Sequence, residues 1–592
     1  MLTAGGSSMA GFIVACERCG TGEGNGGRVT AGDLRACAAL ISPDDIAPRE
    51  PVLWEGDGVA TAVVNPGART AVHEGSLAVG CLYEAGEPWW KLGAPAPDGA
   101  FALCRVGDGG VELVSDLYAS RTPWYVLTDT LFLASSSQRA LVALLGSFVL
   151  NEEAMPWLLS SGYMPPSAGW DRRIKPLAPA SRLTLDRRRW TLEEVREPVP
   201  FLPVEGDEHT HIERLRLAIL DACARLDVPW DAWRLALSGG IDSRLILMGL
   251  TAAGHRPACI TWGRVAARRD HRNDAVIGEL LAARMGVPHM FLPTDFTNEP
   301  LESAVGRFVA VSDGRTCSLG AYADGLRMWS ELVEGGVEGV IRGDEPSQGY
   351  RWHYVSEDAC RLRATALMVS DYPPSHPLHR LGLAPQAWPR DLCRRPGESL
   401  NAYGGRLFQD YWSPAMLSPL NDLKGLYLEV ANPLLSRSVV VASHSLPESL
   451  RRGRRAMRSV HASMKVGLPL AAHSALVGGQ AYLARPAFVA ELRRGLSLPA
   501  AEQLFSDEGR AVLDGLTGES PAPASRWSGV RPVVKQMVPR RAAQRLRPHV
   551  HVSLSGNAVA FRAYLAVRAV EMLTADAGRL PERSVALDRV AR

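Results

Sequence analysis

The sequence predicts an α/β protein whose two halves are built differently. Residues 1–205 are rich in short β-type runs separated by turn signals, which is typical of antiparallel strands and hairpins. In residues 206–592, strand-like runs alternate at first with helical ones, which indicates a parallel sheet covered by helices. A chain of 592 residues has room for about two to four domains. We therefore expect two domains, 1–205 and 206–592.

The first half is expected to be mainly β-structure. Its helical patterns are few, and the clearest are AGDLRACAALI (31–41) and EEAMPWLLSSGY (152–163). The expected strands are GVATAVV (58–64), GSLAVGCLY (75–83), GAFALCRV (99–106), GVELVSDL (110–117), PWYVLTD (123–129) and TLFLASSS (130–137).

The second half is expected to open with repeated strand and helix units. Beyond residue 390 the pattern is mostly helical with Arg-rich and Pro-rich connections, and residues 515–550 are expected to form an irregular excursion. The expected units are the helix 211–226, the strand 233–237, the helix 243–254, the strand 258–263, the helix 274–286 and the strand 289–292.

Composition excludes several classes of protein. The formal net charge is +2, from 65 basic and 63 acidic residues, which argues against a nucleic-acid-coating protein. The sequence has no apolar run long enough for a membrane span, and its start lacks the cationic region of a secretory signal. Ten dispersed cysteines fit a reducing cytoplasm, and we interpret Cys16 and Cys19 as ordinary thiols.

The stretch RLALSGGIDSRLIL (234–247) predicts an anion site. Between a strand and a helix, Ser238, Gly239 and Gly240 would present successive backbone N–H groups near the positive end of the helix dipole. Asp242 makes sense beside a phosphate only if Mg²⁺ bridges the two. The sequence therefore predicts a magnesium polyphosphate site, which differs from the GxxxxGK[ST] form. The alternative is a glycine-rich turn without a ligand.

The SGGxDS string resembles the PP-loop of ATP pyrophosphatases, and other segments narrow the resemblance to class B asparagine synthetases. Residues 97–141 resemble that family's N-terminal domain, residues 162–185 its closing segment and residues 407–437 its C-terminal stretch. The matching positions are Asp98, Gly99, Phe101, Ala102, Asp116, Pro123, Tyr125, Ala134 and Ser135. The resemblance implies an Ntn-hydrolase-like antiparallel αββα domain followed by a PP-loop ATP pyrophosphatase domain with helical additions.

One departure from the family bears on the amine that the reaction uses. Glutamine-dependent members begin Met-Cys-Gly-Ile and use that cysteine to release ammonia, but in MAGFIV (9–14) Ala10 takes its place. Residues 1–8 would then be an extension. Without the thiolate no covalent glutaminase is possible. Two related families lack the cysteine and use an internal amine, namely β-lactam synthetases and lasso peptide cyclases. The divergent VIRGDEPSQGY (340–350) favours the peptide-handling family.

The resemblance also assigns roles to residues. It implies ATP and Mg²⁺, with Asp242 and Asp344 as the metal ligands and Asp242, Asp344 and Glu345 as catalytic residues. For Asp344, a loop carboxylate that caps a helix is the alternative. The expected ATP-binding residues are Leu237, Ser238, Gly239, Gly240, Asp242, Ser243, Ile260 and Gly343.

Several family positions have no clear counterpart. The family's late lysine should follow Leu468-Pro469, but Lys465 precedes this point and His473 follows it, so no lysine is assigned. We expect His473 to be an ordinary histidine, with a role as a base as the less favoured reading. Glu429 matches a family glutamate and is expected to be structural. The basic runs 451–455 and 539–548 are expected to be solvated, although the first could also contact pyrophosphate or peptide.

The expected function is ATP-dependent closure of an isopeptide bond. By resemblance, an Asp or Glu side chain of a precursor core peptide would be adenylated and then attacked by the peptide's N-terminal amine, with release of AMP and pyrophosphate. A leader-recognition protein and a leader peptidase would be separate partners. The alternatives are a β-lactam synthetase-like or ammonia-dependent asparagine synthetase-like ligase for a small substrate, and a non-catalytic ATP-binding scaffold.

Overall fold

The computed structural model describes residues 11–18, 28–67, 70–84, 88–476, 481–517 and 554–580. Ala10 and Cys19 lie outside these residues. So do most of the irregular excursion expected at 515–550 and all of the basic run 539–548 within it. Where the structure does describe the first half, all six expected strands and both expected helices are present. The second helix is shorter than expected, because it covers only Met155–Ser161 (α3).

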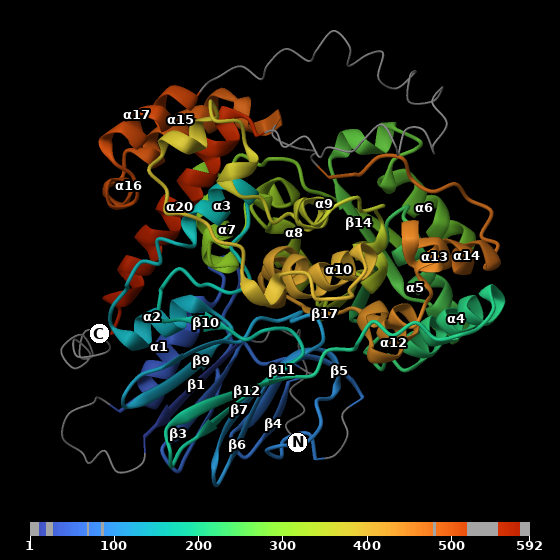
Figure 1. Ribbon diagram of the computed structural model, residues 1–592, viewed down its shortest axis with the longest axis horizontal. Helices are drawn as coiled ribbons and strands as arrows, with labels where there is room; N and C mark the ends of the chain where they lie inside the picture. Colours follow the sequence, from blue (N-terminus) through green and yellow to red (C-terminus); the bar gives the residue numbers. More distant parts are fainter. Residues whose placement is uncertain are drawn as a thin grey trace.

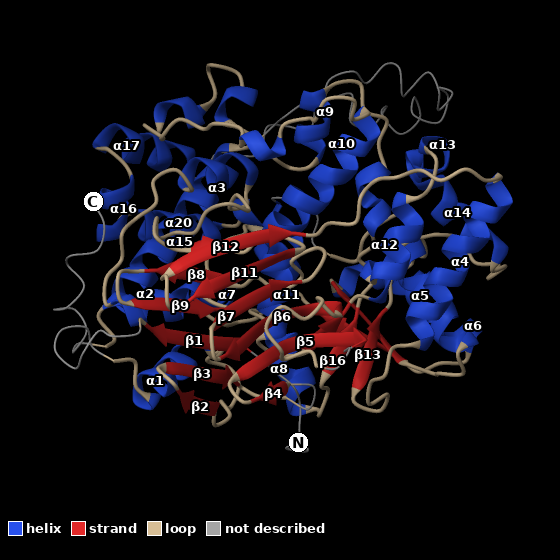
Figure 2. Ribbon diagram, turned by 60° about the horizontal axis from the view of Figure 1, so that its bottom comes forward, coloured by secondary structure: helices blue, strands red, loops and turns tan. Residues whose placement is uncertain are grey.

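Two six-stranded antiparallel sheets fill the first half (Figures 1 and 2). The strand order is β10-β8-β9-β1-β3-β2 in the first sheet and β12-β11-β7-β6-β5-β4 in the second. The strands are β1 (Gly11–Glu17), β2 (Val52–Gly56), β3 (Val59–Val64), β4 (Ala71–His73), β5 (Ser76–Glu84), β6 (Asp98–Gly107), β7 (Gly110–Ser115), β8 (Trp124–Leu127), β9 (Leu131–Ser135), β10 (Lys175–Pro176), β11 (Ser181–Asp186) and β12 (Thr191–Arg196).

The two sheets pack face to face through alternating apolar residues. Phe12 and Phe132 of the first sheet lie in one buried cluster with Val79 and Leu113 of the second. Helices α1 (Ala31–Ile41) and α2 (Gln138–Leu145) pack on the other face of the first sheet. This arrangement confirms three of the four layers that the sequence led us to expect.

The fourth expected layer differs from the prediction. On the outer face of the second sheet, Phe101 packs with Trp89 from the connection that precedes β6. The second half of the chain contacts β5 and β6 of this sheet through β17, and the backbone N–H of Asn432 donates to Tyr83 Oη of β5 at 2.6 Å. A loop and the second half therefore cover a face that a helical layer was expected to cover.

The second half contains a five-stranded parallel sheet of order β15-β14-β13-β16-β17. Its strands are β13 (Trp233–Ala236), β14 (Ala258–Gly263), β15 (His289–Pro293), β16 (Gly339–Ile341) and β17 (Glu429–Ala431). The three expected strands are confirmed. The other two were not predicted, because three residues are too few to show a periodic pattern.

Helices surround this sheet and form most of the chain beyond residue 390, as the sequence predicts (Figure 1). They are α4 (Glu208–Ala224), α5 (Ile241–Ala252), α6 (Asp274–Met285), α7 (Leu301–Ser312), α8 (Arg327–Glu334), α9 (Glu357–Arg363), α10 (Leu400–Leu407), α11 (Ser418–Gly425), α12 (Arg437–His444), α13 (Glu448–Arg451), α14 (Arg455–Ser463), α15 (Pro486–Leu496), α16 (Pro499–Leu504), α17 (Asp507–Leu516) and α20 (Gly556–Ala577). A π-helical segment, Phe408–Leu417, joins α10 to α11.

The two halves share one apolar core. The buried cluster that contains Ile13 and Leu133 of the first half also contains Ile260 and Tyr564 of the second. The long helix α20 packs against α2 and α3 of the first half and against α7 and α15 of the second (Figure 1). The division into domains at residue 205, which falls in the connection between β12 and α4, stays a prediction.

Two further observations concern the whole described chain. Of the helices that the structure describes, none is long and apolar enough to cross a membrane. The nine described cysteines are all free thiols, and only Cys393 is exposed.

Candidate active site

A cavity of about 210 Å³ lies at the carboxyl ends of β13, β14 and β16. Ligands of open α/β sheets commonly bind at this end of the strands. The cavity is lined by Ala236, Leu237, Ser238, Asp242, Ser243, Thr261, Trp262, Asp274, Arg342, Gly343, Asp344, Ser474, Ala475 and Leu476. The loop at 237–240 and the segment at 342–344, which the sequence predicts as a common site, are therefore brought together.

The loop after β13 is held by its own hydroxyl groups. The backbone N–H of Ser238 donates to Ser243 Oγ at 3.0 Å, and the two hydroxyl oxygens lie 3.1 Å apart. The N–H of Leu237 donates to the carbonyl oxygen of Ile260 at 2.8 Å, which ties the loop to β14. Helix α5 then begins directly after Gly240. Its positive end, with the hydroxyls of Ser238 and Ser243, faces the cavity and suits an anion.

Gly239 has a different role from the one predicted. Its backbone N–H donates to Asp274 Oδ1 at 2.9 Å, and its carbonyl oxygen accepts from the N–H of Ala471 at 3.0 Å. A β-carbon at this position would lie 2.4 Å from the β-carbon of Ala471 and 2.9 Å from that of Ile277. The glycine therefore allows close packing within the protein, and its amide is engaged by Asp274, whose involvement sequence reasoning missed.

Gly343 brings the two halves of the site into contact. A β-carbon there would lie 2.8 Å from the backbone nitrogen of Ser243 and 3.1 Å from the β-carbon of Asp242. Such an approach is shorter than carbon side chains tolerate, so only glycine lets the end of β16 approach the first turn of α5. This contact places the predicted ligands Asp242 and Asp344 on one cavity wall.

Asp242 belongs to a buried group of charges. The guanidinium of Arg454 bonds Asp242 Oδ1 and lies 2.9 Å from Glu345 Oε1, so that one cation serves two carboxylates. The amide of Gln348 donates to Asp242 Oδ2 at 3.1 Å. Burial, followed by the negative charge of Glu345, raises the pKa of Asp242 to about 7, against an ordinary value of 3.8. Two carboxylates therefore share one arginine, and this local excess of negative groups adds to the effect of burial on Asp242.

The other two predicted carboxylates differ from one another. Asp344 lines the cavity and pairs with the guanidinium of Arg342 at 3.1 Å. Glu345 is fully buried, and its Oε2 accepts from the backbone N–H and the hydroxyl of Ser347 at 2.7 and 2.5 Å. The helix-capping interpretation that was considered for Asp344 thus describes Glu345, which caps the short helical turn Pro346–Tyr350.

The arginine run at 451–455 is only partly solvated, which corrects the prediction. Arg451 and Arg454 are 3% and 9% exposed, whereas Arg452 and Arg455 are exposed and pair with Glu448 and Glu208. A left-handed backbone at Gly453 and Arg454 separates α13 from α14 and turns the chain here. Arg454 thereby reaches Asp242, 212 residues earlier in the chain.

The predicted ATP-binding residue Ile260 lies outside the cavity lining, as do Glu429 and Lys465, for which no role in the site was predicted. Ile260 is buried in the core and offers only its carbonyl oxygen to the loop, whereas the next residues, Thr261 and Trp262, line the cavity. Glu429 is buried at the start of β17, with Oε2 4.0 Å from Arg121 Nη1. Lys465 is exposed, at the end of α14.

Two titratable residues near the site, His473 and Lys424, differ in their burial. His473 pairs with Asp270 at 2.6 Å, and its side chain is 60% exposed. Lys424 is fully buried, and its ammonium bonds the carbonyl oxygen of Leu420. Burial, with a smaller effect of the Arg342 charge, holds the pKa of Lys424 well below its usual range. Sequence reasoning missed this lysine, although a single cation within the apolar run LKGLYLEV was a signal.

The oxygen ligands suit a magnesium ion that is bound together with phosphate. Among the described residues, no three His, Cys, Asp or Glu side chains form a metal site by themselves. Asp242 and Asp344 nevertheless present carboxylates to one cavity, and burial raises the pKa of Asp242 although Arg454 bonds this carboxylate, so a further cation would favour its ionised form. Mg²⁺ in nucleotide sites is commonly held by one or two carboxylates and by the phosphates.

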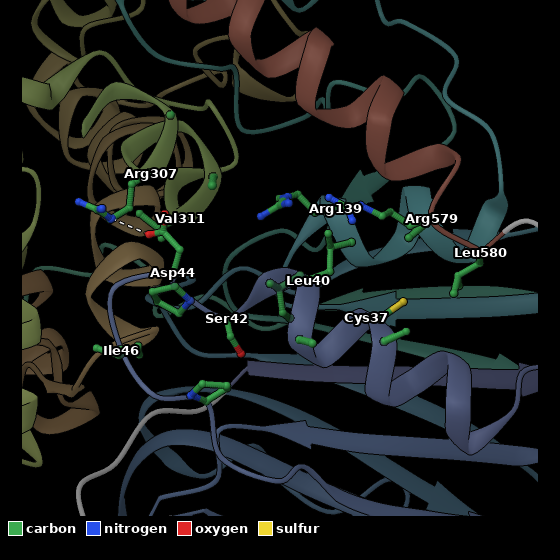
Figure 3. A pocket seen from close by; sticks show the side chains of 18 residues that line it. Cys37, Leu40, Ser42, Asp44, Ile46, Arg139, Arg307, Val311, Arg579 and Leu580 are labelled. Atoms are coloured by element: carbon green, nitrogen blue, oxygen red, sulfur yellow. Dashed lines mark hydrogen bonds and ion pairs between the residues drawn. The ribbon is translucent and has the colours of Figure 1, made fainter. Parts of the chain in front are cut away.

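A larger cavity of about 740 Å³ lies elsewhere, between α1 and α2 of the first half and α7 and the end of α20 (Figure 3). Its walls are about equally polar and apolar. Two of its arginines already have carboxylate partners, because Arg139 pairs with Asp576 at 2.8 Å and Arg307 with Asp44 at 2.6 Å. The residues that line it include none of the ligands that the sequence predicts, so the smaller cavity is the candidate active site.

Comparisons with known proteins give one match in sequence. No family model matches the chain. Over 196 residues the chain is 24% identical to the glutamine-hydrolysing asparagine synthetase 1 of Bacillus subtilis (strain 168), and this covers 31% of the chain and 30% of that enzyme. The match thus spans about a third of the length of this curated relative. The chain is similar, over this part, to an enzyme of the family that its motifs resemble.

Solved structures also match the chain, among them the following two. NMN synthetase from Francisella tularensis is 17% identical, and the match covers 25% of this chain and 58% of that one, with a TM-score of 0.15. The allosteric regulatory enzyme of purine biosynthesis is 8% identical, and the match covers 48% of this chain and 81% of that one, with a TM-score of 0.22.

Proposed function

We propose that this protein is an ATP-dependent, AMP-forming amide ligase that closes an isopeptide bond within a peptide, as lasso peptide cyclases do. The observation that carries the proposal is the meeting of Asp242, at the start of α5, with Asp344, after β16, at one cavity on the carboxyl edge of a parallel sheet. Sequence similarity to an asparagine synthetase supports the ATP-dependent ligase class. The finer assignment to peptides rests on the sequence departures.

In this proposal the chain's residues bind and orient a magnesium polyphosphate. Asp242 and Asp344 would hold the ion, while the N-terminus of α5 and the hydroxyls of Ser238 and Ser243 would face the phosphates. Bound Mg²⁺ would neutralise phosphate charge as the pyrophosphate leaves. Arg454 fixes the Asp242 carboxylate in place, since it bonds Oδ1 directly.

The proposed reaction has two balanced steps. A carboxylate oxygen of the substrate bonds the α-phosphorus of ATP, and the bond to pyrophosphate breaks. An amine nitrogen then bonds the activated carbonyl carbon, the bond to AMP breaks, and the nitrogen loses a proton to solvent or to a base. When amine and carbonyl belong to one bound molecule, effective molarities of about 10⁵–10⁸ M become accessible.

An internal amine is favoured because the described part of the first half offers no suitable thiol for ammonia release. Ala10 stands where the glutamine-dependent family has cysteine. The described cysteines of this half, Cys16, Cys37, Cys81 and Cys104, are all buried. Burial raises the pKa of the Cys104 thiol well above its usual range, so the reactive thiolate is disfavoured there.

The test is mass spectrometry of the purified chain with Mg-ATP and leader-free peptides that carry a free amine and an Asp or Glu, with AMP and ADP quantified in the same samples. We expect a peptide product lighter by one water, one AMP for each product, and loss of both in Asp242→Ala. Asp514→Ala, on an exposed face of α17, is the control and should retain activity.

The other outcomes identify the alternatives. AMP formed only with aspartate and ammonia, or with a small amino-acid substrate, would favour the asparagine synthetase-like or β-lactam synthetase-like ligase. No AMP with any substrate, also after addition of a leader-recognition protein and a leader peptidase, would contradict a ligase and favour an ATP-binding scaffold.

A further inference from the structure

A third cavity, of about 480 Å³, lies beyond the end of β15 and against α15. It is lined by Phe296, Thr297, Glu299, Pro300, Leu301, Arg485, Ala487, Phe488, Ala490, Glu491 and Arg494. Its volume is in the range of cavities that bind small molecules or side chains. Nothing in the proposed reaction uses these residues, so the cavity needs an explanation of its own.

The floor of this cavity is aromatic. The ring centroid of Phe296 lies 5.6 Å from that of Tyr482 and 5.7 Å from that of Phe488. The guanidinium carbon of Arg485 lies 4.6 Å from the centroid of Phe296, so the cation sits over the ring. An apolar group that enters here would contact rings with a positive charge beside it.

Both glutamates that line the cavity are paired with arginines other than Arg485. Glu299 pairs with Arg307 at 2.8 Å, and Glu491 pairs with Arg494 at 2.7 Å. Within the described parts of the chain, the Arg485 side chain forms no ion pair or hydrogen bond with a carboxylate, and it is exposed. The cavity is therefore complementary to a ligand that combines an apolar group with a carboxylate.

The chain fixes how far this cavity can lie from the candidate active site. Trp262, which lines the active-site cavity, pairs in register with Leu292 of β15, and Phe296 follows four residues later. Four residues span at most about 14 Å, so Trp262 and Phe296 are separated by less than about 20 Å. On the other side, Leu476 of the active-site cavity is followed nine residues later by Arg485.

We infer that this third cavity binds the part of the peptide substrate that extends from the active site. The inference rests on the proposed function. Phe296 and Phe488 contact an aliphatic or aromatic side chain, and Arg485 pairs with a carboxylate. Because an extended residue covers about 3.3 Å, that carboxylate lies at most about six residues from the residue that is activated. It is either the C-terminal carboxylate of the peptide or an acidic side chain.

The experiment measures peptide binding without ATP, by fluorescence anisotropy of the full chain. Three synthetic peptides carry a free N-terminal glycine, one Asp and, five residues later, Leu-Phe. The first ends as a free acid, the second as an amide, and the third as an amide with Glu before Leu-Phe. We expect at least one acid form to bind about tenfold more tightly than the neutral amide.

Two variants locate the effect. Arg485→Gln should remove the preference for the acid, while Arg494→Gln, whose cation is already paired in the same cavity, should keep it. The form that is preferred tells whether the carboxylate is terminal or in a side chain. Equal binding of all three peptides, a failure of all three to bind, or an unchanged preference in Arg485→Gln would overturn the inference.

The same samples separate this inference from the proposed function. If the Arg485-dependent preference is present but no AMP or cyclic product forms after addition of Mg-ATP, the peptide site stands and the ligase proposal falls. If cyclic product forms with the same KM in Arg485→Gln and wild type, the ligase stands and the peptide site falls.

Discussion

Two buried groups of charges differ in their balance, although both contain an aspartate and arginine. Asp422, between the two halves, lies 2.9 Å from Arg315 and 3.5 Å from Arg121, and it also accepts from the backbone N–H of Thr122 at 3.1 Å. In the active-site group, Asp242 and Glu345 share Arg454. In the first group Arg121 and Arg315 lie against two carboxylates, those of Asp422 and Glu429, whereas in the second group a single arginine serves two carboxylates.

This difference separates a structural role from a functional one. The donors around Asp422 satisfy a carboxylate that links the first half to α11. Asp242 and Asp344 line a cavity, and the negative charge of Glu345 opposes the ionisation of Asp242, which a bound cation would relieve. Perturbed carboxylates in a cleft are typical of functional sites.

The largest expected effect is the loss of stability in Asp422→Ala. The substitution leaves two buried arginines without their shared partner, which typically costs about 3–5 kcal/mol.

Asp242→Asn should instead stabilise the fold at pH 8. Because the folded pKa of about 7 exceeds the ordinary 3.8, stability falls as pH rises between these values, and asparagine removes that loss.

Urea unfolding of both variants at pH 5 and pH 8, followed by circular dichroism, checks this pair. The advantage of Asp242→Asn over wild type should be larger at pH 8 than at pH 5. A variant that is less stable than wild type at pH 8 would contradict the proposed excess of negative charge.

The next effect concerns Arg454, which we expect to position Asp242. Arg454→Met should lower AMP formation about 100-fold, which is the usual result of removing one organised polar contact from an active site. Arg454→Lys should recover part of the rate, because a cation is restored without the planar geometry. Arg452→Met, an exposed neighbour that pairs with Glu448, is the control. Similar losses in Arg452→Met and Arg454→Met would point to a general effect of the basic run.

A smaller effect is expected from pH. A protonated Asp242 cannot ligate a cation, so the affinity for Mg-ATP should be about tenfold weaker at pH 6 than at pH 8, given a pKa of about 7. Isothermal titration in two buffers of different ionisation enthalpy would also detect the proton that is released. In Asp242→Asn the affinity should be weak and should change little with pH. A pH-independent affinity in wild type would separate Asp242 from the ion.

The sequence predicted the frame of this site better than its charges. Strands at 233–236 and 258–263 and the helix at 241–252 follow from local periodicity, and the SGGxDS string sits between them. Arg454 could not be found in this way, because its contact with Asp242 joins residues 212 positions apart. The role of Gly239 was misjudged for the same reason, since Ala471 and Asp274 meet it only in the folded chain.

The smallest effect is expected at His473, and it tests the boundary of the site. The histidine pairs with Asp270, but its side chain is 60% and that of Asp270 37% exposed, and such pairs contribute about 0–1 kcal/mol. His473→Ala should therefore change the free energy of unfolding by less than about 0.5 kcal/mol and AMP formation by less than about twofold. The measurement is the rate of AMP release between pH 6 and 8. A loss of rate that grows on the acidic side in wild type but is absent in His473→Ala would assign proton transfer to this histidine and extend the functional site to the segment that follows Ala471.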